Sequence, residues 1–382
     1  MISMKRTPFH IYITRFFLVV ALLGQLSCGK DPAVSPSGNE SGSSTETTSE
    51  TETRILKEAS SGSTPANIII MGDGFTKEDY ETNGTFYPAA TRAMNGLLSV
   101  EPFKTYSAYF RVQTVAVYSQ ERGTSFKNSS TKKNTAFSVI LDGNGSTGIT
   151  GNNAEVFRYA LKAQDIDNQS LKNTTIIVIV NYPTYAGTTT MYSDGRAIAY
   201  VALSNGTRQQ TQFEHVVIHE AGGHGFGMLS DEYYDPNSGS INNDKEALEE
   251  LQKWQGYGLL LNVSLTSNQN LCPWKFIFNW PQYSTEYRSV NTYEGGALFA
   301  KGVWRSEPIS CMEDNRPYFN AASRYAIVKR ILNIAGKELT TQQFIQNDHD
   351  RFNTAAMQAQ TRSTISDKSF VPLASPIIVK AE

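Results

Sequence analysis

The stretch FEHVVIHEAGGHGFGMLSDEYY, residues 213–234, contains three of the five histidines of the chain and four carboxylates. A catalytic zinc ion typically takes two imidazoles from one helix, a third nitrogen or oxygen ligand from nearby, and an open position for water. We therefore predict that His219, His224 and Asp231 bind zinc, with Glu232 as the alternative third ligand. Glu220, next to the first histidine, is in the usual position of a general base.

The spacing of the two histidines departs from the common HExxH motif, because His224 comes five positions after His219 instead of four. On an ideal α-helix, side chains five residues apart point about 140° away from one another, so they could not share one ion. One extra residue in the helix, a π-bulge, would bring them together, and Gly222-Gly223 would tolerate it. The alternative pair is His215 with His219, four residues apart, but it leaves Glu220 after the second ligand.

Sequence on the C-terminal side of these histidines supports a metal site. Gly227 can end the helix and let the chain return to supply a third ligand, as in the HExxHxxGxx(H/D) pattern of the metzincins. The metzincin position for that ligand holds Ser230 here, one residue before Asp231. Further on, Ser310-Cys-Met-Glu-Asp314 resembles the metzincin Met-turn, in which a methionine packs beneath the metal ligands, and Met312 is the candidate.

Five segments together resemble one family. They are Asn67-IIIMGDGFTKEDY, Glu101-PFKTYSAYF, HEAGGHGFGMLSDEY, Tyr293-EGGALFAKGVWRSEPISCM and Phe319-NAASRYAIVKRI. The chain resembles the IgA-peptidase-like zinc metallopeptidases, peptidase family M sixty-four, over about residues 66–336. The resemblance implies an endopeptidase acting on protein or peptide substrates, with zinc on His219 and His224 and Glu220 as the base. The alternative is a non-catalytic surface binding lipoprotein that keeps the peptidase fold.

The N-terminus predicts export. Basic residues precede a short apolar run at residues 16–23, and Cys28 follows Ser27. The run is too short to span a bilayer, which favours a lipoprotein signal peptide over residues 1–27 with lipidation of Cys28. The Ser/Thr-rich residues 28–65 are predicted to be a disordered tether. We expect a protein anchored by lipid to a bacterial outer membrane or cell surface, with plain secretion as the alternative.

The remaining composition limits the partners and the fold. A net charge of −2, with scattered lysines and arginines, gives no indication of nucleic-acid binding. Apolar runs and helical patterns alternate, which predicts an α/β domain with a mixed, mostly parallel sheet covered by helices. The resemblance implies that this catalytic domain spans residues 66–336 and has a metzincin-like architecture with an active-site helix. The expected strands are residues 67–71, 110–117, 175–180, 188–192 and 196–203, and the expected helices are residues 87–98, 154–163, 242–254 and a last one through residue 334 capped by Asn320.

Two features of this domain remain open at the level of sequence. The strand at residues 197–203, just before the histidine helix, is a candidate edge strand that would bind the substrate backbone, and otherwise an ordinary sheet strand. Cys272 and Cys311 either form a disulfide or remain buried thiols. Residues 337–382 are expected to be a C-terminal extension packed on the domain.

Overall fold

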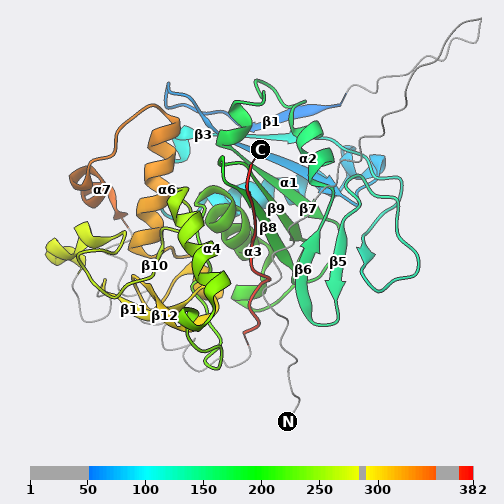
Figure 1. Cartoon of the computed structure of the whole chain (residues 1–382). Helices are drawn as coiled ribbons and strands as arrows, with labels where there is room; N and C mark the ends of the chain where they lie inside the picture. Colours follow the sequence, from blue (N-terminus) through cyan, green and yellow to red (C-terminus); the bar gives the residue numbers. More distant parts are fainter. Residues whose placement is uncertain (1–50, 284–289, 350–369, 382) are drawn as a thin grey trace, which may run out of the picture. The chain divides into compact units, whose positions relative to one another are not determined.

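A seven-stranded mixed sheet forms the frame of the computed structural model, which describes residues 51–283, 290–349 and 370–381 (Figure 1). Four central strands, β3, β2, β7 and β9, are parallel, whereas β1 is antiparallel to β3, β8 is antiparallel to β9, and β13 is parallel to β8. In spatial order the strands are β1 Thr53–Lys57, β3 Phe110–Val115, β2 Ala66–Asp73, β7 Thr174–Val180, β9 Ala197–Ala202, β8 Gly187–Tyr192 and β13 Ile377–Val379. The prediction of a mixed, mostly parallel sheet is therefore confirmed.

Side chains of the central strands alternate between two apolar layers. Ile68, Ile70 and Ile177 face one layer, while Ile69 and Ile176 face the other. Successive side chains on a strand point to opposite faces, so the continuous apolar runs of β2 and β7 require cover on both sides. Every residue of β2, β7 and β9 is buried accordingly.

Helices cover both faces of the sheet. Phe86 and Leu97 of α1 and Ile327 of α6 join the first apolar layer, and Val156 of α2 joins the second. The helices are α1 Phe86–Leu98, α2 Asn153–Ala160, α3 Phe213–Val217, the π-helix η5 Ile218–Phe226, α4 Lys245–Gly256, α5 Cys311–Asp314, α6 Ala321–Ile334 and α7 Thr341–Asn347. Short 3-10 helices are η1 Lys77–Tyr80, η2 Ser107–Tyr109, η3 Ser170–Asn173, η4 Gln209–Thr211, η6 Ile241–Asn243, η7 Lys275–Asn279 and η8 Pro281–Tyr283.

Two small three-stranded sheets complete the described fold. One has the order β10-β12-β11 and the other β4-β5-β6. Their strands are β10 Val263–Ser264, β12 Phe299–Arg305, β11 Tyr293–Gly296, β4 Ser125–Phe126, β5 Ile140–Gly143 and β6 Ser146–Thr150. The first sheet packs with α4 in a separate apolar cluster that includes Trp254 and Val303.

Most predicted elements are found close to their expected bounds. Gly195, with a φ of 97°, makes the turn between β8 and β9 in the left-handed region that glycine favours. Asn320 caps α6, because its side-chain oxygen accepts a hydrogen bond from the backbone N–H of Ser323. These local signals were sufficient to predict both features.

Three predictions need correction or completion. The prediction of a disordered tether over residues 28–65 is wrong at residues 53–57, which form β1 and pair with β3. Of the two interpretations of residues 197–203, the ordinary sheet strand is confirmed and the edge strand is wrong, because β9 lies between β7 and β8. Residues after 336 add both a helix and a strand, since Phe344 of α7 is buried in an apolar cluster and β13 pairs with β8.

Cys272 and Cys311 are both buried free thiols in separate apolar clusters, which answers the disulfide question in favour of thiols. No helix within residues 51–283, 290–349 and 370–381 combines the length and apolarity needed to span a membrane. The predicted signal peptide, Cys28 and most of the tether lie outside the described residues.

Candidate metal centre

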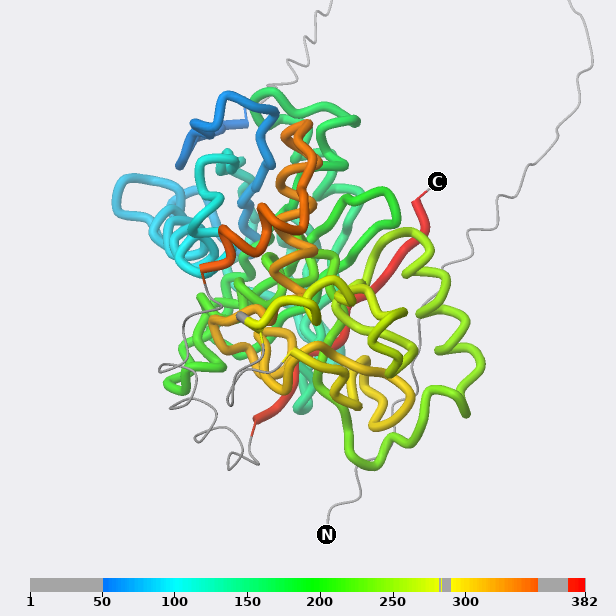
Figure 2. The backbone as a smooth tube through the Cα atoms, turned by 90° about the vertical axis from the view of Figure 1, so that its left-hand side faces the viewer, coloured from blue at the N-terminus to red at the C-terminus, as the bar shows by residue number. Residues whose placement is uncertain are grey.

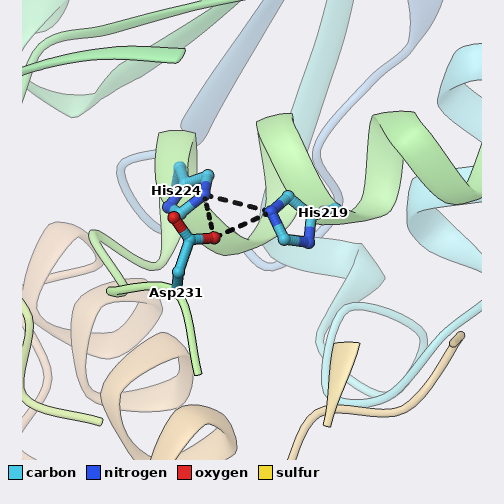
Figure 3. Close-up of side chains that lie close together, drawn as sticks. All are labelled: His219, His224 and Asp231. Carbon is cyan, nitrogen blue, oxygen red and sulfur yellow. Dashed lines mark hydrogen bonds and ion pairs between the residues drawn. The ribbon is translucent and has the colours of Figure 1, made fainter. Parts of the chain in front are cut away.

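The histidine-bearing helix has the extra residue that the five-residue spacing predicted. Helix α3 continues into the π-helix η5, and the N–H of Gly227 donates to the carbonyl of Gly222, five residues earlier, at 2.9 Å. This wider turn brings His219 and His224 together (Figure 3). The prediction of a π-bulge is therefore confirmed, and the two imidazoles share one site.

Glycines allow this helix to pack closely against its surroundings. A Cβ atom on Gly223 would lie 2.2 Å from Sδ of Met312, and one on Gly222 would lie 2.8 Å from Cδ1 of Leu97. Both contacts are shorter than any carbon side chain can accept, so neighbouring groups occupy the space of the missing side chains. Met312 is fully buried and packs directly against η5 at Gly223, next to His224.

Three ligand atoms converge at the site. Nε2 of His219 lies 3.1 Å from Nε2 of His224, and Oδ1 of Asp231 lies 3.3 Å and 3.2 Å from these two nitrogens (Figure 3). All three side chains are at most 3% exposed. Among the described residues this is the one cluster of at least three His, Cys, Asp or Glu side chains with metal-ligand spacing.

The tautomers of the histidines follow from their other ring nitrogens. Nδ1 of His219 is 3.0 Å from the carbonyl oxygen of Cys311, and Nδ1 of His224 is 2.8 Å from that of Leu229. A carbonyl oxygen only accepts, so each Nδ1 carries a proton and each neutral ring presents a lone pair at Nε2. Backbone carbonyls that hold Nδ1–H in this way are the usual support of metal-binding histidines.

The converging lone pairs repel one another unless a cation lies between them. Oδ1 of Asp231 is buried and accepts no hydrogen bond from any described residue. Two nitrogen donors and one anionic oxygen suit zinc, and the orphaned buried oxygen shows that the residues fit such an ion.

Glu220 packs against strand β8. Thr189 of β8 donates to its Oε2 at 2.6 Å, while Oε1 has no hydrogen-bond partner among the described residues. Burial raises the pKa of Glu220 to about 7, although His219 and the bond from Thr189 lower it. Gly187 leaves room for this carboxylate, because a Cβ atom there would lie 2.9 Å from Oε1.

Glu232, the alternative third ligand, belongs to a separate hydrogen-bond network. Its carboxylate accepts from Asn262 at 2.8 Å, Asn320 at 2.6 Å and Ser323 at 3.3 Å. The metal-type cluster therefore contains Asp231 and not Glu232.

His215, the alternative first ligand, also lies apart from this cluster. It lines a pocket with Arg92, Ser204 and Pro317 and contributes no atom to the cluster around His219. The pairing of His215 with His219 is thus not the one that the structure assembles.

Several residues of the site carried no sequence signal. Thr189 reaches Glu220 only because β8 lies beside η5, and the carbonyls of Cys311 and Leu229 act through the backbone, where residue type is irrelevant. Tyr185 and Tyr233 also approach the site, since the carboxylates of Glu220 and Asp231 contribute, after burial, to raising the pKa of each phenol.

A buried His-His-Asp cluster on one helix and the loop after it is a ligand set typical of metal-dependent hydrolases. The chain matches the family model described as IgA Peptidase M64 over residues 55–253, slightly more than half of its length, and it belongs to this family. The family consists of metallopeptidases, so the chain is a peptidase, a hydrolase that acts on proteins or peptides. The search of curated proteins found no match.

Proposed function

We propose that this protein is an exported, zinc-dependent endopeptidase. The observation that carries the proposal is the convergence of two Nε2 lone pairs and Oδ1 of Asp231 within 3.1–3.3 Å, with both Nδ1 atoms already hydrogen-bonded to carbonyls. His219, His224 and Asp231 would hold the ion, and Met312 would support it from below. The matching family, whose model spans all three ligand residues, supports the same reading.

When bound, zinc would polarise a water molecule and the scissile carbonyl and would stabilise negative charge on the carbonyl oxygen. The residues of the chain would do the rest. Glu220 would accept the proton of the attacking water through Oε1, the oxygen without a described partner, and would then donate it to the departing amine. Thr189, bonded to Oε2, would fix the orientation of that carboxylate.

The buried environment of Glu220 favours its role as general base. The carboxylate is completely buried, and its pKa of about 7 reflects the cost of keeping it ionised there. A general base has most effect when its pKa is near the working pH. A protein that only bound peptides would gain nothing from an ionisable group in this position.

Replacement of Glu220 by glutamine tests hydrolysis against binding. Glu220→Gln keeps the shape of the side chain and leaves all three ligands in place, so zinc content and thermal unfolding should equal those of the wild type. Peptide hydrolysis should fall by a factor on the order of 100 to 10,000, the usual contribution of a positioned acid or base. A peptide library with mass-spectrometric detection gives the cleavage rates.

Glu214→Gln is the matched control, because Glu214 lies on the same helix but pairs with Arg92 away from the ligands. It should cleave at the wild-type rate. Unchanged cleavage by Glu220→Gln would assign the base elsewhere. Absence of cleavage by the wild type across the library, with zinc bound, would support the alternative of a non-catalytic binding lipoprotein.

A further inference from the structure

The outer edge of β8, where a substrate strand could otherwise pair, is covered by β13 of the same chain. Strand β8 is the strand nearest to Glu220 at the end of the sheet, and β13 pairs with its outer side. The pairing is parallel, with Ile377 opposite Thr190 and Val379 opposite Tyr192. Figures 1 and 2 both draw this last segment, in red, as an extended chain. We call residues 371–379 the C-terminal strap.

Before it reaches β13, the strap is held by hydroxyl groups that donate to its backbone carbonyls. The hydroxyl of Tyr185 donates to the carbonyl of Val371 at 2.9 Å, and that of Tyr233 donates to the carbonyl of Leu373 at 2.8 Å. These carbonyls are two residues apart, as on one side of an extended peptide. Contacts to backbone carbonyls do not depend on residue type, so any extended peptide could make them.

The two tyrosines connect the strap to the candidate metal centre. Tyr233, which donates to the carbonyl of Leu373, is two residues after Asp231 in the chain. Tyr185 is two residues before Gly187, the residue that packs against Glu220, and it receives a hydrogen bond from Asn315 at 2.9 Å. The strap is therefore held by two residues that are close in the chain to Asp231 and to the strand that packs against Glu220.

Leu373 anchors the strap through its side chain. It is only 3% exposed and belongs to the same apolar cluster as Met312 and Val216, whereas Val371 is 53% exposed. Proline at positions 372 and 376 limits the conformations of the free strap, so that less entropy is lost when it is held in extended form. The strap thus has one buried anchor and a pre-ordered extended backbone.

We propose that residues 371–376 occupy the peptide groove of the metal centre, so that the strap is an internal competitor that must leave before a substrate binds. The proposal rests on the proposed peptidase function. It also assigns Tyr185 and Tyr233 as the residues that hold substrate carbonyls, and it predicts an apolar, leucine-like side chain at the subsite that Leu373 fills. If the strap is bound most of the time, the apparent affinity for substrate is reduced by the fraction of molecules in which it is displaced.

Full-length Leu373→Ala tests this competition. Loss of the anchor should lower the KM for a fluorogenic peptide at least tenfold and leave kcat unchanged, because the strap competes with substrate and takes no part in the chemistry. A synthetic peptide of residues 370–381 should inhibit this variant competitively and inhibit the wild type at least tenfold less. Val371→Ala, on the exposed side of the same segment, is the matched control and should retain the wild-type KM.

Amide hydrogen exchange over residues 371–381 provides a readout that does not require activity. Exchange should be faster in Leu373→Ala than in the wild type. Faster exchange with an unchanged KM would overturn the proposal. If Leu373→Ala does not fold, Ile378→Asp replaces it. Ile378 packs at the edge of the cluster around Trp254, so a charged residue there should weaken the attachment of the strap at β13.

Failure of the proposed function gives a different result. If the wild type and all variants bind zinc but cleave no peptide, the peptidase proposal fails. The affinity of the groove for a labelled peptide can still be measured by fluorescence anisotropy. Binding to Leu373→Ala at least tenfold tighter than to the wild type would still support the strap as a competitor, and equal binding would refute it.

Discussion

Protonation of two ring nitrogens decides what the centre can bind. Because Nδ1 of His219 and of His224 each donates to a carbonyl, the remaining Nε2 atoms are acceptors that face each other at 3.1 Å. Two neutral acceptors at that distance repel, and Oδ1 of Asp231 adds negative charge. A divalent cation between these two nitrogens and the carboxylate oxygen would attract all three atoms and so remove their mutual repulsion. We therefore expect metal binding to stabilise the fold as well.

Loss of either imidazole should remove the metal. We expect about one zinc ion per chain in the wild type, because the described residues contain one cluster of three candidate ligands, and less than a tenth of that in His219→Ala or His224→Ala. His215→Ala is the matched control, because His215 lies outside the cluster, and it should keep full occupancy. Elemental analysis of the purified proteins measures this, and full zinc content in both ligand variants would refute the assignment.

Two neighbouring carboxylates should respond differently to amide substitution. Asp231→Asn should lose zinc, whereas Glu232→Gln should keep it. In Glu232→Gln an amide N–H₂ would face the N–H₂ donors of Asn262 or Asn320, so we expect the free energy of unfolding to fall by about 1–3 kcal/mol. Asn262 cannot simply turn over, because its oxygen accepts from the N–H of Ser230.

Zinc analysis together with denaturant unfolding distinguishes the two carboxylate variants. Loss of zinc from Glu232→Gln with wild-type content in Asp231→Asn would reverse the assignment of the third ligand.

At the scale of elements, the π-helix η5 is the feature that makes the five-residue spacing usable. Its wider turn is compatible with the sequence because Gly222 and Gly223 leave space for Leu97 and Met312. The short helix α5 acts from the other side, since Cys311 supplies a carbonyl to His219 and the carbonyl of Met312 accepts from the N–H of Glu232 at 2.7 Å. The two elements therefore position the ligands jointly.

A methyl group at position 223 should disturb this packing. Gly223→Ala should lower the free energy of unfolding by about 1–3 kcal/mol, the usual effect of overpacking, because its Cβ atom meets Sδ of the buried Met312. In the double variant with Met312→Ala the loss should be smaller than the sum of the two single losses, since the clash is gone. Additive losses would show that the two residues do not interact.

The control for that experiment is Gly256→Ala, at the end of α4, where a new Cβ atom would meet nothing within 4 Å. Its stability should be unchanged or slightly greater, since alanine favours a helix more than glycine does. Denaturant unfolding followed by circular dichroism measures all four variants.

At the scale of the whole molecule, both ends of the described chain enter the main sheet. Strand β1 pairs with β3 at one edge and β13 pairs with β8 at the other. Strands β3 and β8 are thus each covered by a segment near one end of the described chain, and the short strands β1 and β13 form the two edges of the sheet. The pairing of β13 with β8 begins at Thr190, next to Thr189, the residue that donates to Glu220.

The prediction about cellular location rests on the N-terminal residues, which lie outside the described part of the chain. We propose export and lipid anchoring through Cys28, based on the basic N-terminus, the short apolar run and the polar residues that follow. Metabolic labelling with a fatty acid should tag the wild type and fail on Cys28→Ala. Cys272→Ala is the control and should remain labelled. A mature, unlabelled N-terminus at another position would indicate simple secretion.

The sequence by itself determined the local features of this protein. The five-residue spacing with two glycines required a π-turn, Asn320 marked the start of α6, and long apolar runs identified β2 and β7 as buried strands. Each of these depends on residues close together in the chain, where backbone geometry and side-chain chemistry act directly.

Tertiary structure alone decided which distant groups meet. Asp231 and Glu232 are adjacent and chemically alike, and only the position of Asn262 and Asn320 directs one away from the histidines. The apolar sequence of β9 is compatible with an edge strand and with an interior strand. Its interior position follows from its pairing with β8. That β13 lies against β8 depends on contacts across nearly two hundred residues of chain, which no local periodicity encodes.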